Sequence, residues 1–466
     1  MLQEQKREKL SSRIGFLFLS AACAIGLGNI WRFPYITGQN GGALFVLLYL
    51  LFLALLGFPI LVMELSVGRA GQENLVGSIR KLSPEGGKFP WVKVISFFFI
   101  GNLILMMFYT TVTGWLIAYA CGYLSGGLME HSSAQEFEQA FSALTGSPLR
   151  SVLYLSVTVL LGSLACGLGL RRGVESIIKA MMVFLLVMLF LLAGKALTMP
   201  GAKEALDFYL APDFGRFREN GIFQAVYAAM GQAFFTLSIG IGSMAIFGSY
   251  IGKEHSLSKE SVFIIVLDTF VALTAGLIIF PICFSFGINP GSGPGLIFLS
   301  LPNIFSEMGG GRCWGFLFFL FMTLAAMTTV IAVFENLVAL LMDEFHFSRR
   351  KAALTVGLTV FVLSLPCALG YSVLKFIRPF GEGSSILDLE DFIVSQNMLP
   401  LGSLFILLFC TLRYGWGWRN FLSEADTGHG MKFPVFLKHY IFWFLPCLII
   451  IIFLMGYLDK FFLPGN

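Results

Sequence analysis

Long runs of apolar residues, separated by short polar stretches, follow one another along almost the whole chain. A helix needs about 20 predominantly apolar residues to cross the hydrocarbon core of a bilayer. By that measure the pattern predicts eleven membrane-spanning helices, near residues 13–37, 41–66, 92–124, 151–170, 174–197, 223–252, 260–287, 313–343, 350–372, 389–412 and 435–459. We therefore expect an all-α integral membrane protein.

Two of these spans, the first and the sixth, carry helix-breaking residues near mid-depth. Residues 21–35 read AACAIGLGNIWRFPY, and residues 231–243 read GQAFFTLSIGIGS. A small-residue face that packs helices is the simplest explanation for one such segment. Two of them at matching places in two halves instead indicate a transporter built from inverted repeats. Non-helical backbone is tolerated at this depth only where it is buried or lines a cavity.

The two breaks predict the domain organisation. An N-terminal half, residues 1–197, would hold spans one to five, and an inverted half, residues 198–412, would hold spans six to ten. Residues 413–466 would form a peripheral eleventh span and a tail. The longest polar stretches, 125–150 and 198–222, are interpreted as connectors or as lids on the outer side.

Composition and charge narrow the function. Of the 466 residues 57% are hydrophobic and only 12% are charged, whereas soluble domains carry about 25% charged residues. The net charge of +4 is too small and scattered for nucleic-acid binding. Most of the 31 Lys and Arg residues fall in the segments predicted to be cytoplasmic. By the positive-inside rule we expect a multi-pass protein of the plasma (inner) membrane, with a cytoplasmic N-terminus and an extracytoplasmic C-terminus.

Three other function classes are alternatives to transport. The sequence contains no HExxH, GxSxG or Walker-type motif, so we expect no enzyme. A sensor would want an appended signalling domain, which is not expected here. A channel is harder to dismiss, but charged pairs at both ends of the pathway favour alternating access.

Three segments resemble one known family. AIGLGNIWRFPY, GQAFFTLSIGIGSM and the eighth-span AAMTTVIAVFEN are similar to motifs of the neurotransmitter:sodium symporters, and the similarity runs from about residue 7 to 412. Bacterial amino-acid transporters with eleven spans are the most similar members. The resemblance implies a sodium-coupled symporter that imports a neutral amino acid by alternating access.

The resemblance also implies a substrate site between spans one, three, six and eight. The substrate carboxylate would bind the backbone N–H groups of Leu27 and Gly28 and the hydroxyl of Tyr109. Monoamine-transporting members have an aspartate where this chain has Gly26, so this substrate should bring its own carboxylate. The residues implied are Ala24, Leu27, Gly28, Tyr109, Phe235, Thr236, Ser238, Ile241, Thr329 and Val333. Phe235 and Tyr109 would form the lid.

Two sodium sites follow from the same resemblance. The first would use Ala24, Asn29, Thr236 and Asp268 together with the substrate carboxylate, and the second Ala22, Ile25, Ala325, Thr328 and Thr329. Animal members that need chloride have asparagine at the position of Asp268. We therefore expect transport without chloride, because a mid-membrane carboxylate is costly and needs a partner. A structural ion pair is the alternative, although no Lys or Arg lies near Asp268 in its own span.

Gates and substrate size complete the implied site. Arg32 and Asp391 would form the outer gate, and Arg7 and Asp343 the inner gate, with Ser249 and Tyr250 beside it. Ile241 and Val333 are smaller than the phenylalanine and isoleucine of the leucine-transporting members. This difference favours a large hydrophobic or aromatic amino acid. Oligomeric state is not predicted.

Overall fold

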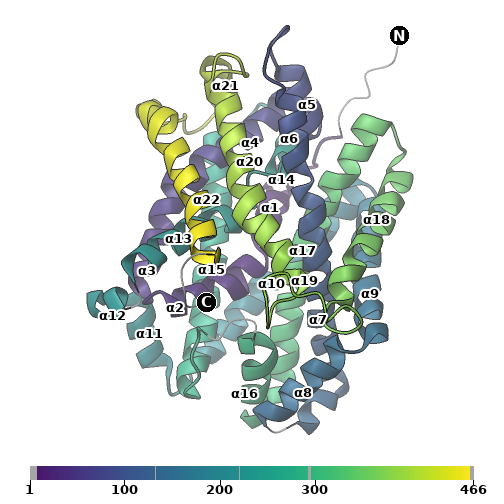
Figure 1. Cartoon of the computed structure of the whole chain (residues 1–466), viewed down its shortest axis with the longest axis vertical. Coiled ribbons are helices and arrows are strands. Elements are labelled where there is room, and N and C mark those ends of the chain that lie inside the picture. Colours follow the sequence, from purple (N-terminus) through teal and green to yellow (C-terminus); the bar gives the residue numbers. More distant parts are fainter. Residues whose placement is uncertain (1–7, 132, 220, 292–294, 462–466) are drawn as a thin grey trace.

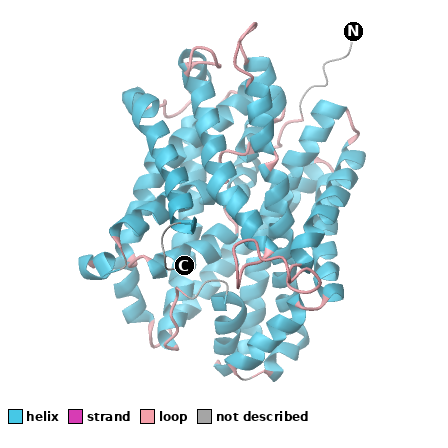
Figure 2. Ribbon diagram, in the orientation of Figure 1, coloured by secondary structure: helices cyan, strands magenta, loops and turns pink. Residues whose placement is uncertain are grey.

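A computed structural model describes residues 8–131, 133–219, 221–291 and 295–461 (Figure 1). All regular structure in these ranges is helical, and Figure 2 shows how loops only connect the helices. Nine continuous helical stretches are long and apolar enough to cross a membrane: Ala43–Gly71, Trp91–Ser125, Pro148–Gly167, Leu170–Ala196, Leu257–Ser285, Gly311–Phe345, Arg349–Leu369, Ile386–Thr411 and Val435–Leu458.

Some of these stretches consist of two helices joined by a π-helical turn. The helices of all nine stretches are α3 (Ala43–Phe52), α4 (Phe58–Gly71), α6 (Trp91–Phe99), α7 (Gly101–Ser125), α9 (Pro148–Gly167), α10 (Ser176–Ala196), α15 (Leu257–Ser285), α17 (Gly311–Phe345), α18 (Arg349–Leu369), α19 (Ile386–Asp391), α20 (Leu399–Thr411) and α22 (Leu445–Phe461). The π-helical segment η6 (Phe392–Met398) joins α19 to α20. Each stretch lies within a few residues of a span predicted from sequence.

The first predicted span is a bent pair. Helix α1 (Arg13–Ala24) ends before the glycines, and the chain resumes as a helix over Gly28–Gln39, which contains α2 (Phe33–Gln39), at an angle of 56°. The residue after α1, Ile25, has an extended backbone. The predicted break in span one is therefore confirmed.

The sixth predicted span is also interrupted. Helix α13 (Ile222–Thr236) ends at the predicted place, and α14 (Ser243–Tyr250) begins only after six residues of turn. Neither piece alone is long enough to span a bilayer, so nine continuous helices and one bent pair meet the criterion among the described residues. The total of eleven spans stays a prediction.

Short helices gather at the two ends of the molecule (Figure 1). Helices α5 (Leu75–Leu82) and α21 (Trp418–Ala425) lie at the end where the described chain begins, which we call the α21 end. At the other, the α8 end, lie the short helices α8 (Ala134–Thr145), α11 (Ala202–Leu210), α12 (Phe214–Glu219) and α16 (Leu301–Glu307). The stretches 125–150 and 198–222 thus contain helices and are not plain connectors.

Helix α17 forms the centre of the bundle. It packs against α7, α10, α1 and α9, and from Ala325 to Ala339 every residue of it is buried. Large apolar side chains remain exposed on peripheral helices, for example Leu160 on α9 and Phe190 on α10. A helix in a bilayer needs no polar outer face, because the surrounding lipid hydrocarbon chains are themselves apolar. The arrangement therefore buries both breaks at the centre of the bundle.

Candidate functional site

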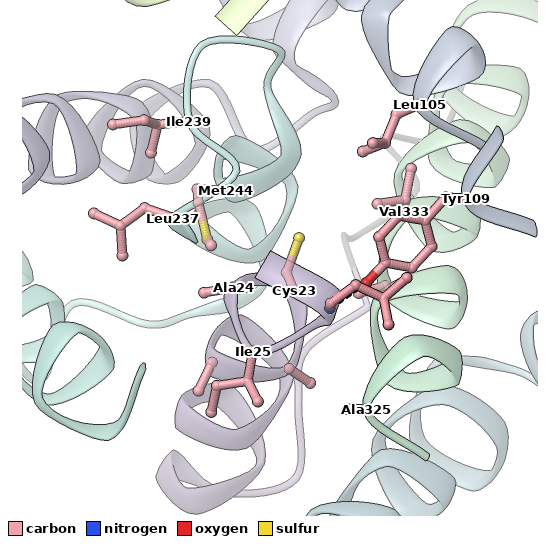
Figure 3. Close-up of a cluster of buried hydrophobic side chains, with 14 of the residues drawn as sticks. Cys23, Ala24, Ile25, Leu105, Tyr109, Leu237, Ile239, Met244, Ala325 and Val333 are labelled. Atoms are coloured by element: carbon pink, nitrogen blue, oxygen red, sulfur yellow. Dashed lines mark hydrogen bonds between the residues drawn. The ribbon is translucent and has the colours of Figure 1, made fainter. Parts of the chain in front are cut away.

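The break in span one is stabilised by side chains that bind its freed N–H groups. The Gly26 N–H donates to the Asn29 side-chain oxygen at 3.1 Å, and the Leu27 N–H donates to the Tyr109 hydroxyl at 3.0 Å. In Figure 3, Cys23, Ala24 and Ile25 lie at this break, with Tyr109 and Val333 on one side of it. Buried N–H groups need such partners, so Tyr109 of α7 fixes the local backbone.

The break in span six requires unusual backbone conformations. Ser238 has φ +50°, and Gly240 and Gly242 have φ +100° and +84°. A left-handed conformation suits glycine and is strained for most other residues. The Glu64 carboxylate of α4 accepts from the N–H groups of Gly240 at 2.8 Å and Met244 at 2.9 Å. The negative charge thus lies at the start of α14, where the helix dipole favours it.

Asn102 of α7 holds the other side of the same turn. Its amide donates to the Ile241 carbonyl at 2.6 Å, and its oxygen accepts from the Ser243 hydroxyl at 2.9 Å. Sequence reasoning missed both Asn102 and Glu64. Glu64 could have been found from the sequence, because an ionisable residue within an apolar span is by default a candidate for function.

The side chains predicted for the first sodium site lie together. The Asn29 amide donates to Asp268 Oδ1 at 2.8 Å and to Thr236 Oγ1 at 3.2 Å, and Thr236 Oγ1 donates to Asp268 Oδ2 at 3.0 Å. All three residues are fully buried. Asp268 therefore has hydrogen-bond partners and no ion pair with a described Lys or Arg. A cation between these groups would require the Asn29 amide to turn, so that its oxygen faces the carboxylate.

The second predicted sodium site has a different character. The Thr329 hydroxyl oxygen lies 3.2 Å from the Ala22 carbonyl, 3.3 Å from the Ile25 carbonyl and 3.4 Å from the Ala325 carbonyl. The neighbouring Thr328 hydroxyl donates to Ala325 at 2.8 Å. One hydroxyl proton can serve only one acceptor at a time. The surplus of oxygen ligands around one point is what a hard cation prefers.

A small cavity of about 20 Å³ lies between the two breaks. It is lined by Cys23, Ala24, Gly26, Gly28, Leu105, Tyr109, Phe235, Ser238, Thr329 and Leu399. Leu105 and Leu399, from α7 and α20, were not predicted. Ile241 and Val333 are fully buried but outside this lining, so their place in the pocket stays a prediction. Thr236 faces the first sodium cluster.

Glycines allow the side chains around this cavity to approach the backbone closely. A methyl group at Gly26 would lie 2.3 Å from the Tyr109 hydroxyl, and one at Gly28 would lie 2.8 Å from the Phe235 ring. Twenty cubic ångströms is about the room that one water molecule needs. A molecule larger than water can fit only if side chains of the lining, such as Phe235 and Tyr109, move apart.

Above these two rings opens a vestibule of about 660 Å³. Leu27, Arg32, Tyr109, Phe235 and Asp391 all contribute to its wall. Arg32 and Asp391 are joined through Ser395, whose hydroxyl accepts from Arg32 at 3.4 Å and donates to Asp391 at 2.6 Å. The Arg32 guanidinium also lies 4.2 Å from the centre of the Phe235 ring. The residues of the predicted outer gate therefore meet directly above the lid.

The residues of the predicted inner gate lie at the α21 end, except that Arg7 falls outside the described residues. The Asp343 carboxylate accepts from the Asn74 backbone N–H at 2.7 Å. The Tyr250 hydroxyl donates to Glu335 at 2.7 Å, and the Ser249 hydroxyl donates to the Ile246 carbonyl. Glu335 is held in turn by Arg349 at 2.8 Å, a buried pair that sequence reasoning missed.

Comparison with known proteins gives a consistent result. A model of the sodium:neurotransmitter symporter family matches residues 7–140 and 145–461. The chain is 34% identical to the uncharacterised sodium-dependent transporter YhdH of Bacillus subtilis (strain 168), over 97% of this chain and 98% of that one. It is 25% identical to sodium-dependent nutrient amino acid transporter 1 of Drosophila grimshawi, over 96% of this chain and 76% of that one. The crystal structure of MhsT in complex with L-phenylalanine superposes with a TM-score of 0.85 at 36% identity, covering 97% of this chain and all of that one.

Proposed function

The chain belongs to the sodium:neurotransmitter symporter family, and we propose that it imports a neutral amino acid, hydrophobic or aromatic, together with two sodium ions and without chloride. Family members are sodium-dependent transporters in the membrane and not enzymes. Identity of the substrate, the number of ions and the chloride requirement are our proposals, as are the cytoplasmic N-terminus and the extracytoplasmic C-terminus.

The observation that carries the proposal is the group of oxygens around Thr329. Three carbonyls from α1, its break and α17 lie within 3.4 Å of one hydroxyl, all of them buried. A sodium ion here would join the end of α1 to α17. Binding would therefore favour one relative position of these two helices, which is how an ion can drive a conformational change.

An amino-acid substrate is supported by the neutral backbone around the cavity. Gly26 supplies no carboxylate to pair with the amine of a substrate, whereas the Tyr109 hydroxyl, which accepts from the Leu27 N–H, keeps a proton that it can donate to a carboxylate. Leu105, Phe235 and Leu399 give the cavity an apolar wall. Two relatives agree with this substrate class: MhsT, whose structure is a complex with L-phenylalanine, and the sodium-dependent nutrient amino acid transporter 1.

Independence from chloride is supported by Asp268. Its carboxylate lies against Asn29 and Thr236 and forms no ion pair with the Lys and Arg residues described. A sodium ion at this point would find its counter-charge in the protein. With two sodium ions and a neutral amino acid, each cycle would carry two positive charges inward, each gaining about 2.3 kcal/mol per 100 mV.

Uptake by purified protein in liposomes tests the proposal. The twenty amino acids are compared under an inward sodium gradient and with potassium in its place, and sodium gluconate then replaces sodium chloride. We expect uptake of aromatic or large aliphatic amino acids only with sodium, and no loss in gluconate. Equal uptake of every amino acid without sodium would overturn the proposal, and loss in gluconate would overturn only the role of Asp268.

A matched pair of variants tests the second sodium site. Thr329→Ala removes the hydroxyl around which the carbonyls gather, while Thr329→Ser keeps it. We expect the sodium concentration for half-maximal uptake to rise at least tenfold in T329A and less than threefold in T329S. Equal effects in both variants would show that the methyl group, and not the oxygen, matters.

A further inference from the structure

Helix α19 carries a buried acid that none of the sites above uses. Glu390 is 4% exposed, and both of its carboxyl oxygens are shielded from solvent and bound by no N–H or O–H donor, with only the weakly donating Cys367 thiol beside them among the described residues. It also lies in no ion pair among the residues that the structure describes. The two other acids of the same short helix differ, because Asp388 binds Ser385 and Asp391 binds Ser395.

Among the described residues, no Lys or Arg lies beside Glu390. From α18 the Cys367 thiol lies beside it, and from α7 Thr111 lies next to that thiol. Tyr371, just after α18, is hydrogen-bonded to Ser385 and packs on Trp115. The segment η6 holds no titratable residue. The other charged residues of α19 are the acids Asp388 and Asp391, which would repel a negative charge on Glu390.

An ionised carboxylate in such a place is unfavourable. Burying an unpaired charge costs several kcal/mol even after the protein relaxes, and a carboxyl group avoids the cost by taking up a proton. We propose that Glu390 is a proton-binding site, neutral while α19 packs against α7 and α18 as described. The carboxylate takes one proton from water and becomes a carboxylic acid, and the reverse step returns that proton to water.

Release of the proton would be coupled to the vestibule. Helix α19 supplies Leu387, Asp388 and Asp391 to the vestibule wall, and Asp391 is the residue joined to Arg32 through Ser395. A charged Glu390 can be hydrated only if α19 moves away from α7 and α18. Such a movement displaces Asp391 as well, so protonation of Glu390 favours the closed position of the outer gate.

Infrared spectroscopy of the purified protein tests the proposal without a substrate. The absorption of protonated carboxyl groups at neutral pH is compared between wild type, Glu390→Gln and the control Asp388→Asn. We expect the band to be weaker in E390Q and unchanged in D388N, since Asp388 is a hydrogen-bonded acceptor. An E390Q spectrum identical to wild type in this region would overturn the proposal.

Thermal unfolding at several pH values gives a second, independent readout. The folded protein would hold a proton that the unfolded chain releases, so its stability should fall as the pH rises above about 4.3, the usual pKa of a free glutamate, until the folded protein releases the proton as well. We expect a smaller decrease of the unfolding temperature in E390Q and in Glu390→Met. A decrease equal to that of wild type would contradict the proposal. Failure of both variants to fold would also contradict it, because a neutral carboxyl in an apolar place should tolerate a neutral replacement.

Discussion

The two ends of the molecule are closed in different ways. At the α21 end, ion pairs are buried or partly buried: Arg349 with Glu335 at 2.8 Å, Arg69 with Glu424 at 2.6 Å and, with Arg13 partly exposed, Arg13 with Glu260 at 3.0 Å. At the α8 end, Arg32 and Asp391 are joined only through the Ser395 hydroxyl, in the wall of a vestibule of about 660 Å³.

This difference indicates which end opens more readily. Water can replace the hydrogen bonds of a hydroxyl at the edge of a vestibule with little loss of free energy. Separation of a buried ion pair instead leaves charges without solvent or partner. The described state is therefore accessible from the α8 end down to the Phe235 and Tyr109 rings, and firmly closed at the α21 end. Transport by alternating access would need the buried pairs to separate in a later step.

The largest effect is expected from loss of Arg349. Glu335 has no exposed side-chain surface, and Arg349 forms two hydrogen bonds to it, at 2.8 and 3.0 Å. Arg349→Met leaves the Glu335 carboxylate buried with only the Tyr250 hydroxyl shown bonded to it. We expect the free energy of unfolding, measured by urea titration in micelles, to fall by about 3–5 kcal/mol.

The adjacent Arg350 is exposed and provides the control for this measurement. Arg350→Met should change the free energy of unfolding by less than about 0.5 kcal/mol. The double variant E335Q/R349M should regain much of the loss, because no charge is then left unpaired. Equal losses in R349M and R350M would show that burial of charge does not close the α21 end.

A smaller effect is expected at Arg69, which joins three segments of this end. Its guanidinium donates to the Glu424 carboxylate, to the Glu424 carbonyl and, at 2.8 Å, to the His255 carbonyl. Glu424→Gln keeps an oxygen acceptor and the backbone bonds but removes the charge. We expect a loss of about 2 kcal/mol in the same unfolding experiment, typical of one charge-assisted hydrogen bond. A loss as large as that of R349M would mean that α21 is held by this one carboxylate.

Ser395 tests the α8 end. Ser395→Ala removes the hydroxyl between Arg32 and Asp391, whereas Ser395→Thr keeps one. One hydrogen bond contributes about 1 kcal/mol, which corresponds to about a fivefold change in an equilibrium constant. We expect the amino-acid concentration for half-maximal uptake to rise by about that factor in S395A, with unfolding unchanged. If instead S395A destabilised the protein and left uptake intact, the hydroxyl would be part of the scaffold and not of the gate.

Much of this arrangement could be predicted from the sequence, and what could not has a physical reason. Apolar runs predict spans because their length is fixed by the bilayer, and glycines at mid-depth predicted both breaks, at Ile25 and at residues 237–242. Asn29 lies beside Thr236, and Thr329 lies beside the Ala22 carbonyl, two pairs that the family resemblance groups in the first and the second sodium site. The role assigned to each remains a prediction.

Contacts between distant spans were not predictable in this way. Glu64 binds residues 176 and 180 positions later, and Arg69 binds Glu424, 355 positions away. No periodicity or motif links such positions, because the helices meet only through tertiary packing. The neighbour of Ile241 was not predictable either. Gly101 lies against Ile241, so that a methyl group added at Gly101 would come within 2.6 Å of the Ile241 side chain.

The smallest effect is expected from an exposed ion pair at the α21 end. Arg80 of α5 lies 2.6 Å from Glu344, but its side chain is 54% exposed, and water can solvate both charges after they separate. Exposed pairs contribute at most about 1 kcal/mol, so Arg80→Gln should lower the free energy of unfolding by about 0.5 kcal/mol. The effect should vanish in high salt, which screens exposed charges and leaves the Arg349–Glu335 pair little changed. If R80Q cost as much as R349M, the number of ion pairs, and not their burial, would distinguish the two ends.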